Sequence, residues 1–137
     1  MRVLLDTSVL VAGLVAAHPM HARAVPWLQK AKRGEIALSV AAHTIAELYS
    51  VLTTLPVRPR IAPSVARQLI RESVESSATF VALSHADYRA VVNELSERGL
   101  SGGVVYDALI ARAAEKARAE QLVTLDPDDF RRARGRP

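Results

Sequence analysis

Short apolar segments alternate along this chain with segments of helical periodicity, and this alternation restricts the possible folds more than any other feature. Four apolar runs are expected to form strands: residues 2–5, 36–40, 79–83 and 122–125. Helices are expected over residues 9–17, 21–33, 42–55, 64–77, 85–98 and 106–120, with a short helix opening at Asp126. Strands that alternate with helices form a parallel sheet covered on both faces. The pattern therefore predicts an α/β fold, a doubly wound sandwich.

The composition excludes several other classes of protein. Half of the 137 residues are hydrophobic and 23% are charged, which argues against disorder. Charges interrupt every apolar run before it reaches the length of a membrane span. The absence of cysteine excludes disulfide scaffolds, thiolate metal sites and cysteine nucleophiles. We expect one domain over residues 1–137, without a signal peptide or a membrane segment and located in the cytoplasm.

The basic residues allow two interpretations. The net charge is +4, and only three of the 18 basic residues are lysines. Basic residues are concentrated in Lys30–Arg33, in the proline-rich segment that contains Arg58 and Arg60, and in the tail Arg131–Arg136. Arginine is well shaped to contact phosphate, so these clusters are candidates for binding nucleic acid. An ordinary solvated surface explains them equally well.

Four acidic residues are placed where a parallel sheet would build a site. Asp6 and Asp126 come directly after expected strands, Asp107 begins an alanine-rich helix, and Glu47 borders the apolar face of another helix. Sites in open parallel sheets lie beyond the carboxyl ends of the strands. If the two strands are neighbours, these carboxylates converge and can hold Mg²⁺ or Mn²⁺ for phosphodiester hydrolysis. The alternative is that each aspartate only caps or begins its helix.

Four motifs together resemble a known family. They are Val3–Leu10 around Asp6, Ala46–Leu48 around Glu47, Gly102–Ala111 around Asp107 and Leu122–Phe130 around Asp126. In this order and spacing they resemble a PIN-domain ribonuclease, and most of all the VapC-type toxins of bacterial toxin–antitoxin (VapBC) pairs. The resemblance implies a PIN-like α/β/α sandwich with a central parallel sheet of four to five strands. It also implies RNA cleavage that depends on Mg²⁺ or Mn²⁺ and leaves 5′-phosphate and 3′-hydroxyl ends.

The resemblance also assigns roles to individual residues. The catalytic metal site would consist of four carboxylates: Asp6, Glu47, Asp107 and Asp126. Auxiliary positions would be Thr7 or Ser8 beside this site, Thr124 orienting the last carboxylate, and Asp129 as a further acidic residue. Such a scheme needs no histidine, so His18, His21, His43 and His85 are expected to be ordinary helix and loop residues.

Partners follow from the same resemblance. With RNA as the substrate, Arg58 and Arg60, together with the tail Arg131–Arg136, become candidates to contact its phosphates. A cognate VapB-type antitoxin would cover the active-site groove and aim a basic side chain at the carboxylates, and the toxin would form a homodimer. The alternative function is a PIN-like module that binds RNA or protein without cutting. An intact set of acidic residues favours the nuclease.

Overall fold

Four parallel strands form the central sheet of the computed structural model, which describes residues 1–134, apart from the side chains of residues 129, 132 and 134. They are β1 (Arg2–Leu5), β2 (Ala37–Ala41), β3 (Ala78–Val81) and β4 (Gln121–Val123), in the order β3-β2-β1-β4. The predicted strand 2–5 is confirmed in both bounds, and the other three are displaced by one or two residues. A fifth strand, which the resemblance allows, is not found among the described residues.

The strand order reverses beside β1. The chain passes from β1 outward to β2 and β3, and β4 then pairs with the other side of β1. Leu5 is in register with Val123, and the Asp6 backbone N–H donates to the Val123 carbonyl at 3.2 Å. The carboxyl ends of β1 and β4 therefore meet at the switch point, the place where open α/β sheets bind their ligands.

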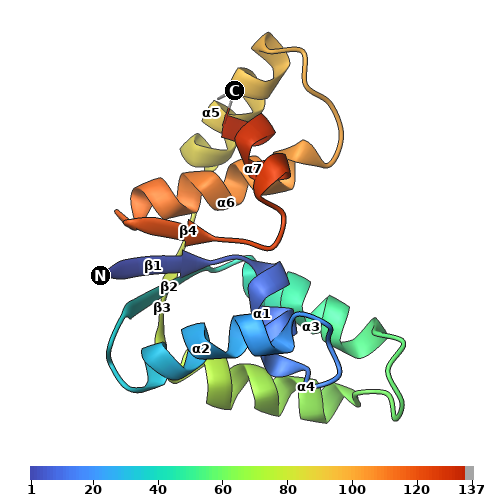
Figure 1. Ribbon diagram of the computed structural model, residues 1–137. Coiled ribbons are helices and arrows are strands. Elements are labelled where there is room, and N and C mark those ends of the chain that lie inside the picture. The colour runs from blue at the N-terminus through green and yellow to red at the C-terminus, as the bar shows by residue number, and fades with distance from the viewer. Residues whose placement is uncertain (135–137) are drawn as a thin grey trace.

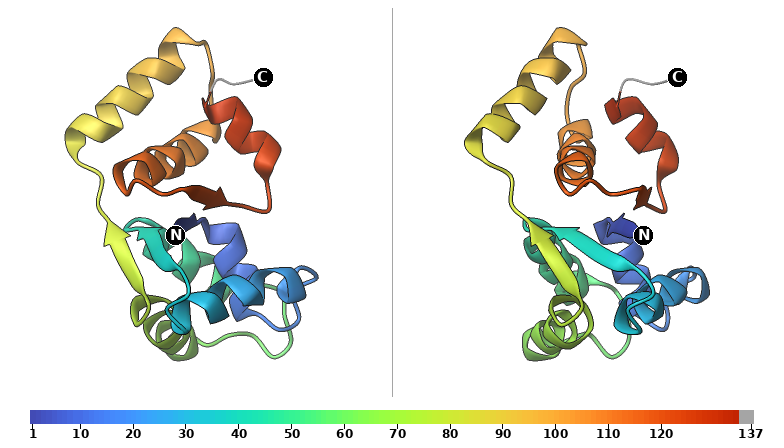
Figure 2. Two further views of the ribbon diagram at one scale, coloured as in Figure 1. Left: turned by 60° about the vertical axis from the view of Figure 1, so that its left-hand side comes forward. Right: turned by 90° about the vertical axis from the view of Figure 1, so that its left-hand side faces the viewer.

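Helices cover both faces of the sheet, as predicted (Figures 1 and 2). On one face lie α1 (Thr7–Leu14), α2 (His21–Lys32), α3 (Thr44–Thr54) and α4 (Pro63–Ile70). On the other lie α5 (His85–Glu97), α6 (Val104–Lys116) and α7 (Pro127–Arg134). The helix predicted over 64–77 is in fact two pieces, because α4 continues as the π-helix η1 (Arg71–Glu75). No helix within residues 1–134 is long and apolar enough to cross a membrane.

Strand β1 supplies core residues to both layers. Val3 and Leu5 pack in the cluster that α1, α3 and α4 share, whereas Leu4 packs with α6 and Phe130 of α7. Successive side chains of a strand point to opposite faces, which explains this division. Val3, Leu4 and Leu5 are all fully buried. A central strand held on both faces gives the residue after it, Asp6, a fixed position.

Asp87 of α5 forms ion pairs with two basic residues of α6. It closes a capping box with Ser84 at the start of α5. Its carboxylate also accepts from Lys116 Nζ at 2.8 Å and from Arg112 Nε at 3.0 Å. The hydrogen bond from Lys116, followed by those from Ser84 and Arg112, holds the pKa of Asp87 well below its usual range. A lowered pKa means that ionised Asp87 stabilises the fold above the pKa of the unfolded chain, and that this contribution is lost as the pH falls.

Replacing Asp87 with asparagine is therefore expected to destabilise the protein in a pH-dependent way. At pH 7 the Tm of Asp87→Asn falls by several degrees, because Lys116 and Arg112 lose their anionic partner. The difference from wild type shrinks as the pH drops below about 4, where the carboxylate of the unfolded chain becomes protonated. Thermal unfolding followed by circular dichroism from pH 7 to pH 3 measures this, with Asp128→Asn on an exposed side chain as control. A difference in Tm that does not change with pH would contradict this role.

Candidate active site

A cavity of about 650 Å³ opens at the carboxyl ends of β1 and β4, beside α1, α3 and α6. It is the place that the strand order singles out. Its lining includes all four predicted carboxylates, Asp6, Glu47, Asp107 and Asp126. Thr7 and Ser8 line it as well. Residues far apart in the sequence thus surround one space.

Asp6 is the most firmly held of these carboxylates. Its side chain is buried at the end of β1, where it caps α1. Oδ1 accepts from the Ser8 backbone N–H at 2.7 Å, from the Ser8 hydroxyl and from the Val9 N–H at 3.3 Å. Oδ2 accepts from Thr124 Oγ1 at 2.6 Å. The capping interpretation of Asp6 is therefore right, and the same hydrogen bonds fix its carboxylate at the cavity wall.

Thr124 connects the two strand ends. Its hydroxyl donates to Asp6 Oδ2 and accepts from the Asp126 backbone N–H at 3.0 Å. Next to it, the Leu125 N–H donates to Ser8 Oγ at 3.1 Å. The resemblance assigned Thr124 the role of orienting Asp126, and the structure adds a direct hydrogen bond from Thr124 to Asp6. The Asp126 side chain is exposed, and Pro127 begins α7 directly after it.

Glu47 reaches the cavity from the first turn of α3. One carboxylate oxygen accepts from Thr7 Oγ1 at 3.2 Å, and the other lies 3.9 Å from His43 Nε2. Burial lowers the pKa of His43 more than the neighbouring Glu47 carboxylate raises it, so the imidazole is neutral at pH 7. Thr7 is thus the donor that orients Glu47, a pairing across 40 positions that the motif around Asp6 does not reveal.

Asp107 lines the cavity from α6. It lies in the first turn of α6 and is partly buried. Carboxylates are favoured at this end of a helix, where backbone N–H groups point outward. With Asp6 on the strand side and Asp107 on the helix side, negative charge faces the cavity from two layers.

The carboxylates surround the cavity without forming a closed cage. Among the side chains that the structure describes, which exclude that of Asp129, no group of three or more histidine, aspartate and glutamate residues is assembled tightly enough to hold a metal ion. Like charges repel one another when no cation is present. Mg²⁺ keeps several water ligands and uses one or two carboxylates together with substrate phosphate. An oxygen-only donor set around a roomy cavity therefore fits a hydrated Mg²⁺ or Mn²⁺ ion.

Several predicted residues lie outside this cavity. Arg58 and Arg60 are exposed on the loop between α3 and α4, which begins at the cavity-lining Leu55. In the basic tail, Arg131 forms an ion pair with Asp128. The side chain of Asp129 and residues 135–137 lie outside the described residues.

Two cavity residues with polar side-chain groups, His18 and Tyr106, were not assigned a role from the sequence. His18 lines the cavity, while its Nδ1 accepts from the Met20 N–H at 3.0 Å and so shapes the turn before α2. Tyr106 lines it too and is 60% exposed. The one feature of the sequence that could have indicated a role for Tyr106 was its position directly before Asp107.

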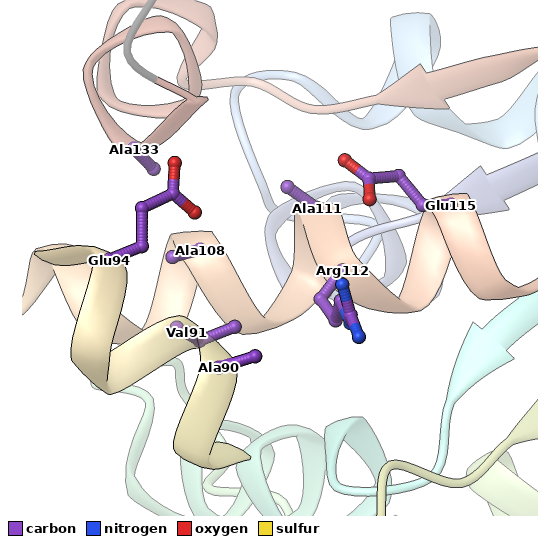
Figure 3. Close-up of a pocket in the computed structure, with 8 residues that line it drawn as sticks. All are labelled: Ala90, Val91, Glu94, Ala108, Ala111, Arg112, Glu115 and Ala133. Atoms are coloured by element: carbon purple, nitrogen blue, oxygen red, sulfur yellow. The ribbon is translucent and has the colours of Figure 1, made fainter. Parts of the chain in front are cut away.

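A smaller cavity of about 120 Å³ lies between α5, α6 and α7. Figure 3 shows that alanines make up much of its lining, with Glu94 on α5 and Glu115 on α6. Glu115 is thus on the same helix as Asp107 but lines a different space, which makes it a matched control for that residue.

Comparisons with known proteins identify the family and the fold. The PIN domain family model matches residues 3–136. Ribonuclease VapC40 of Mycobacterium tuberculosis is 38% identical over 121 residues, which cover 88% of this chain and 84% of that protein. The crystal structure of VapC20 from Mycobacterium tuberculosis, described as a Sarcin-Ricin loop cleaving toxin, superposes with a TM-score of 0.71 at 15% identity. That match covers 93% of this chain and 92% of the VapC20 chain. VapBC2 of Rickettsia felis, solved with a DNA fragment from its promoter, matches with a TM-score of 0.64 at 21% identity. That match covers 96% of this chain and 92% of the matched Rickettsia felis chain. This chain belongs to the PIN-domain family.

Proposed function

We propose that this protein is a divalent-metal-dependent endoribonuclease and the toxin of a type II toxin–antitoxin pair. Membership of the PIN family and 38% identity to a named VapC ribonuclease support the activity. The observation that carries the assignment is the buried Asp6 carboxylate, fixed by Ser8, Val9 and Thr124 at the wall of a cavity that three further carboxylates line.

Each residue has a distinct task in this proposal. Asp6 and Asp107 would hold the principal Mg²⁺ or Mn²⁺ ion, and Glu47 and Asp126 would complete its shell or bind a second ion when RNA supplies phosphate oxygens. When bound, such an ion supplies Lewis-acid activation of the scissile phosphate and of the attacking water. Among the auxiliary residues, Ser8 and Thr124 orient Asp6, and Thr7 orients Glu47. Asp129, whose side chain lies outside the described residues, remains a proposed auxiliary ligand.

Partners follow from the family and from the surface. RNA is the substrate, and a VapB-type antitoxin is the inhibitor, consistent with the two-component VapBC2 neighbour. A basic side chain of the antitoxin would face the carboxylates, because several negative charges close together on the cavity wall are stabilised by a positive charge. We place residues 1–137 in one PIN domain that acts in the cytoplasm, and the homodimer stays a prediction.

Incubation with RNA tests the proposed function. Purified protein is mixed with total RNA in Mg²⁺, in Mn²⁺ or in EDTA, and the fragment ends are sequenced. We expect discrete fragments with 5′-phosphate and 3′-hydroxyl ends in either metal and none in EDTA. Equal cleavage in EDTA would contradict a metal-dependent reaction. Absence of cleavage by the folded protein in either metal would favour the non-catalytic binding module.

The loop arginines give a second expected result. Arg58 lies three positions after Leu55 at the cavity, and three such steps span at most about 11 Å. If Arg58 and Arg60 each contact one phosphate of single-stranded RNA, the double glutamine variant lowers the slope of log K against log salt by about 1.4. Binding is measured in EDTA, so that no RNA is cut. The control replaces Arg71 and Arg89, two exposed arginines that do not line the cavity. An unchanged slope for Arg58→Gln/Arg60→Gln would assign these residues to solubility alone.

A further inference from the structure

Tyr106 is a large aromatic residue that the core does not explain. Its side chain is 60% exposed, far more than the buried residues Val104 and Ala108 on the same helix. Among the described residues, its ring and hydroxyl have no hydrogen-bond or ring partner. Aromatic side chains contribute most when they are covered, so an exposed ring at a site opening is available to a ligand.

Tyr106 and Asp107 are neighbours in one helical turn. Both residues lie in the first turn of α6 and both line the active-site cavity. Ile110, four residues later and therefore on the same helix face as Tyr106, lines the cavity as well. An apolar strip thus runs along α6 beside the carboxylate of Asp107.

Further apolar residues face the same cavity. Val11 of α1 and Val51 of α3 line it, followed by Leu55 at the end of α3. The cavity is therefore lined by both acidic residues, Asp6 and Asp107 among them, and apolar residues. Such a mixed lining suits the two parts of a nucleotide, a phosphate that needs a cation and a base whose faces are apolar.

We infer that Tyr106 stacks against an unpaired RNA base next to the scissile phosphate. This inference rests on the proposed ribonuclease function and adds a residue that selects and positions the substrate. Proteins that bind single-stranded RNA commonly stack its bases on exposed aromatic rings. Tyr106 lies in the same helical turn as Asp107, so a base stacked on its ring brings the adjoining phosphate to the carboxylates. Tyr106 is a substrate-positioning residue and takes no part in the bond-breaking step.

Binding without cleavage tests the stacking directly. The probes are a fluorescein-labelled pool of randomised single-stranded RNA about 12 nucleotides long and an abasic ribose-phosphate chain of the same length. Affinities are measured by fluorescence anisotropy in EDTA. We expect Tyr106→Ala to bind the base-bearing pool about 5- to 150-fold more weakly than wild type, the usual range for one lost stacking contact. Its affinity for the abasic probe stays unchanged.

Two further variants separate stacking from other effects. Tyr106→Phe keeps the ring and is expected to retain wild-type affinity for both probes. Tyr88→Ala removes a tyrosine that is 39% exposed on α5, outside the cavity, and is expected to change neither affinity. Because Tyr106 is exposed, the alanine variant is also expected to keep the wild-type Tm.

Steady-state cleavage in Mg²⁺ supplies a second readout. Tyr106→Ala is expected to raise KM and to leave kcat close to wild type, the pattern of a residue that binds substrate and transition state equally. The inference is overturned if Tyr106→Ala keeps the wild-type ratio of affinities for the two probes, or if wild type does not distinguish them. A wild-type protein that cuts no RNA would contradict the proposed function, and the binding ratios would still decide the role of Tyr106.

Discussion

The variant Asp6→Asn is expected to lose RNA cleavage by at least about 10³-fold, a loss typical of removing a group that stabilises developing charge. Asp6 is the carboxylate that the structure positions most completely, with its two oxygens held by Ser8, Val9 and Thr124. Asparagine has the same shape but no negative charge, so it cannot attract a divalent cation in the same way. The measurement is the initial rate of RNA cleavage in Mg²⁺ and in Mn²⁺.

The fold is expected to tolerate Asp6→Asn. Asparagine is as good a helix cap as aspartate, so its carbonyl oxygen still accepts from the Ser8 and Val9 N–H groups. The new amide can donate to Thr124 Oγ1, which turns its own proton elsewhere. Circular dichroism and Tm check the fold. Asp128→Asn, on an exposed aspartate of α7, is the matched control and keeps wild-type activity. Activity above a tenth of wild type in Asp6→Asn would refute its role as a metal ligand.

Asp107→Asn is expected to have the second-largest effect, a loss of about 10²- to 10³-fold in cleavage rate. Asp107 supplies negative charge to the cavity from α6. Without it the cavity keeps its shape and loses one of the two proposed principal ligands. The rate is measured over a series of Mn²⁺ concentrations, because a lost ligand raises the concentration needed for half-maximal activity.

The control for Asp107 lies on the same helix. Glu115→Gln removes an acidic residue of α6 that lines the smaller cavity between α5, α6 and α7 (Figure 3). It changes the net charge by the same amount as Asp107→Asn. We expect wild-type rates for Glu115→Gln at every Mn²⁺ concentration. If both variants lose activity equally, the effect comes from the overall charge of the helix, and Asp107 has no specific part in the site.

The sequence was sufficient to predict the sheet and its flanking helices because strands and helices carry different hydrophobic periods. It also predicted that Asp6 and Asp126 would converge if their strands were neighbours, and β1 does pair with β4. Strand order itself depends on packing between distant segments, and the sequence alone left that condition open. The break between α4 and η1 was missed because the buried residues Ala66, Ile70 and Val74 continue one four-residue spacing through both pieces.

The details of the site depend on contacts across the chain. Thr124 donates a hydrogen bond to Asp6, which is 118 positions away in the sequence, and Thr7 donates one to Glu47, which is 40 positions away. A local sequence pattern carries no information about pairs that are so far apart in the chain. The sequence also posed capping and metal binding as alternatives for Asp6. Geometry makes them compatible, because Oδ1 caps α1 while the carboxylate as a whole lies at the cavity. Tyr106 was overlooked because a tyrosine on a helix is usually partly buried, and only the folded chain reveals its exposure.

Direct titration with Mn²⁺ tests the central claim, that this cavity holds a divalent cation. The free ion is followed by electron paramagnetic resonance as it is added to wild type and to Asp6→Asn, Asp107→Asn, Asp128→Asn and Glu115→Gln. We expect saturable binding by wild type and by the two control variants, and much weaker binding by Asp6→Asn and Asp107→Asn. Equal binding by all five proteins would place the ion elsewhere and contradict the account.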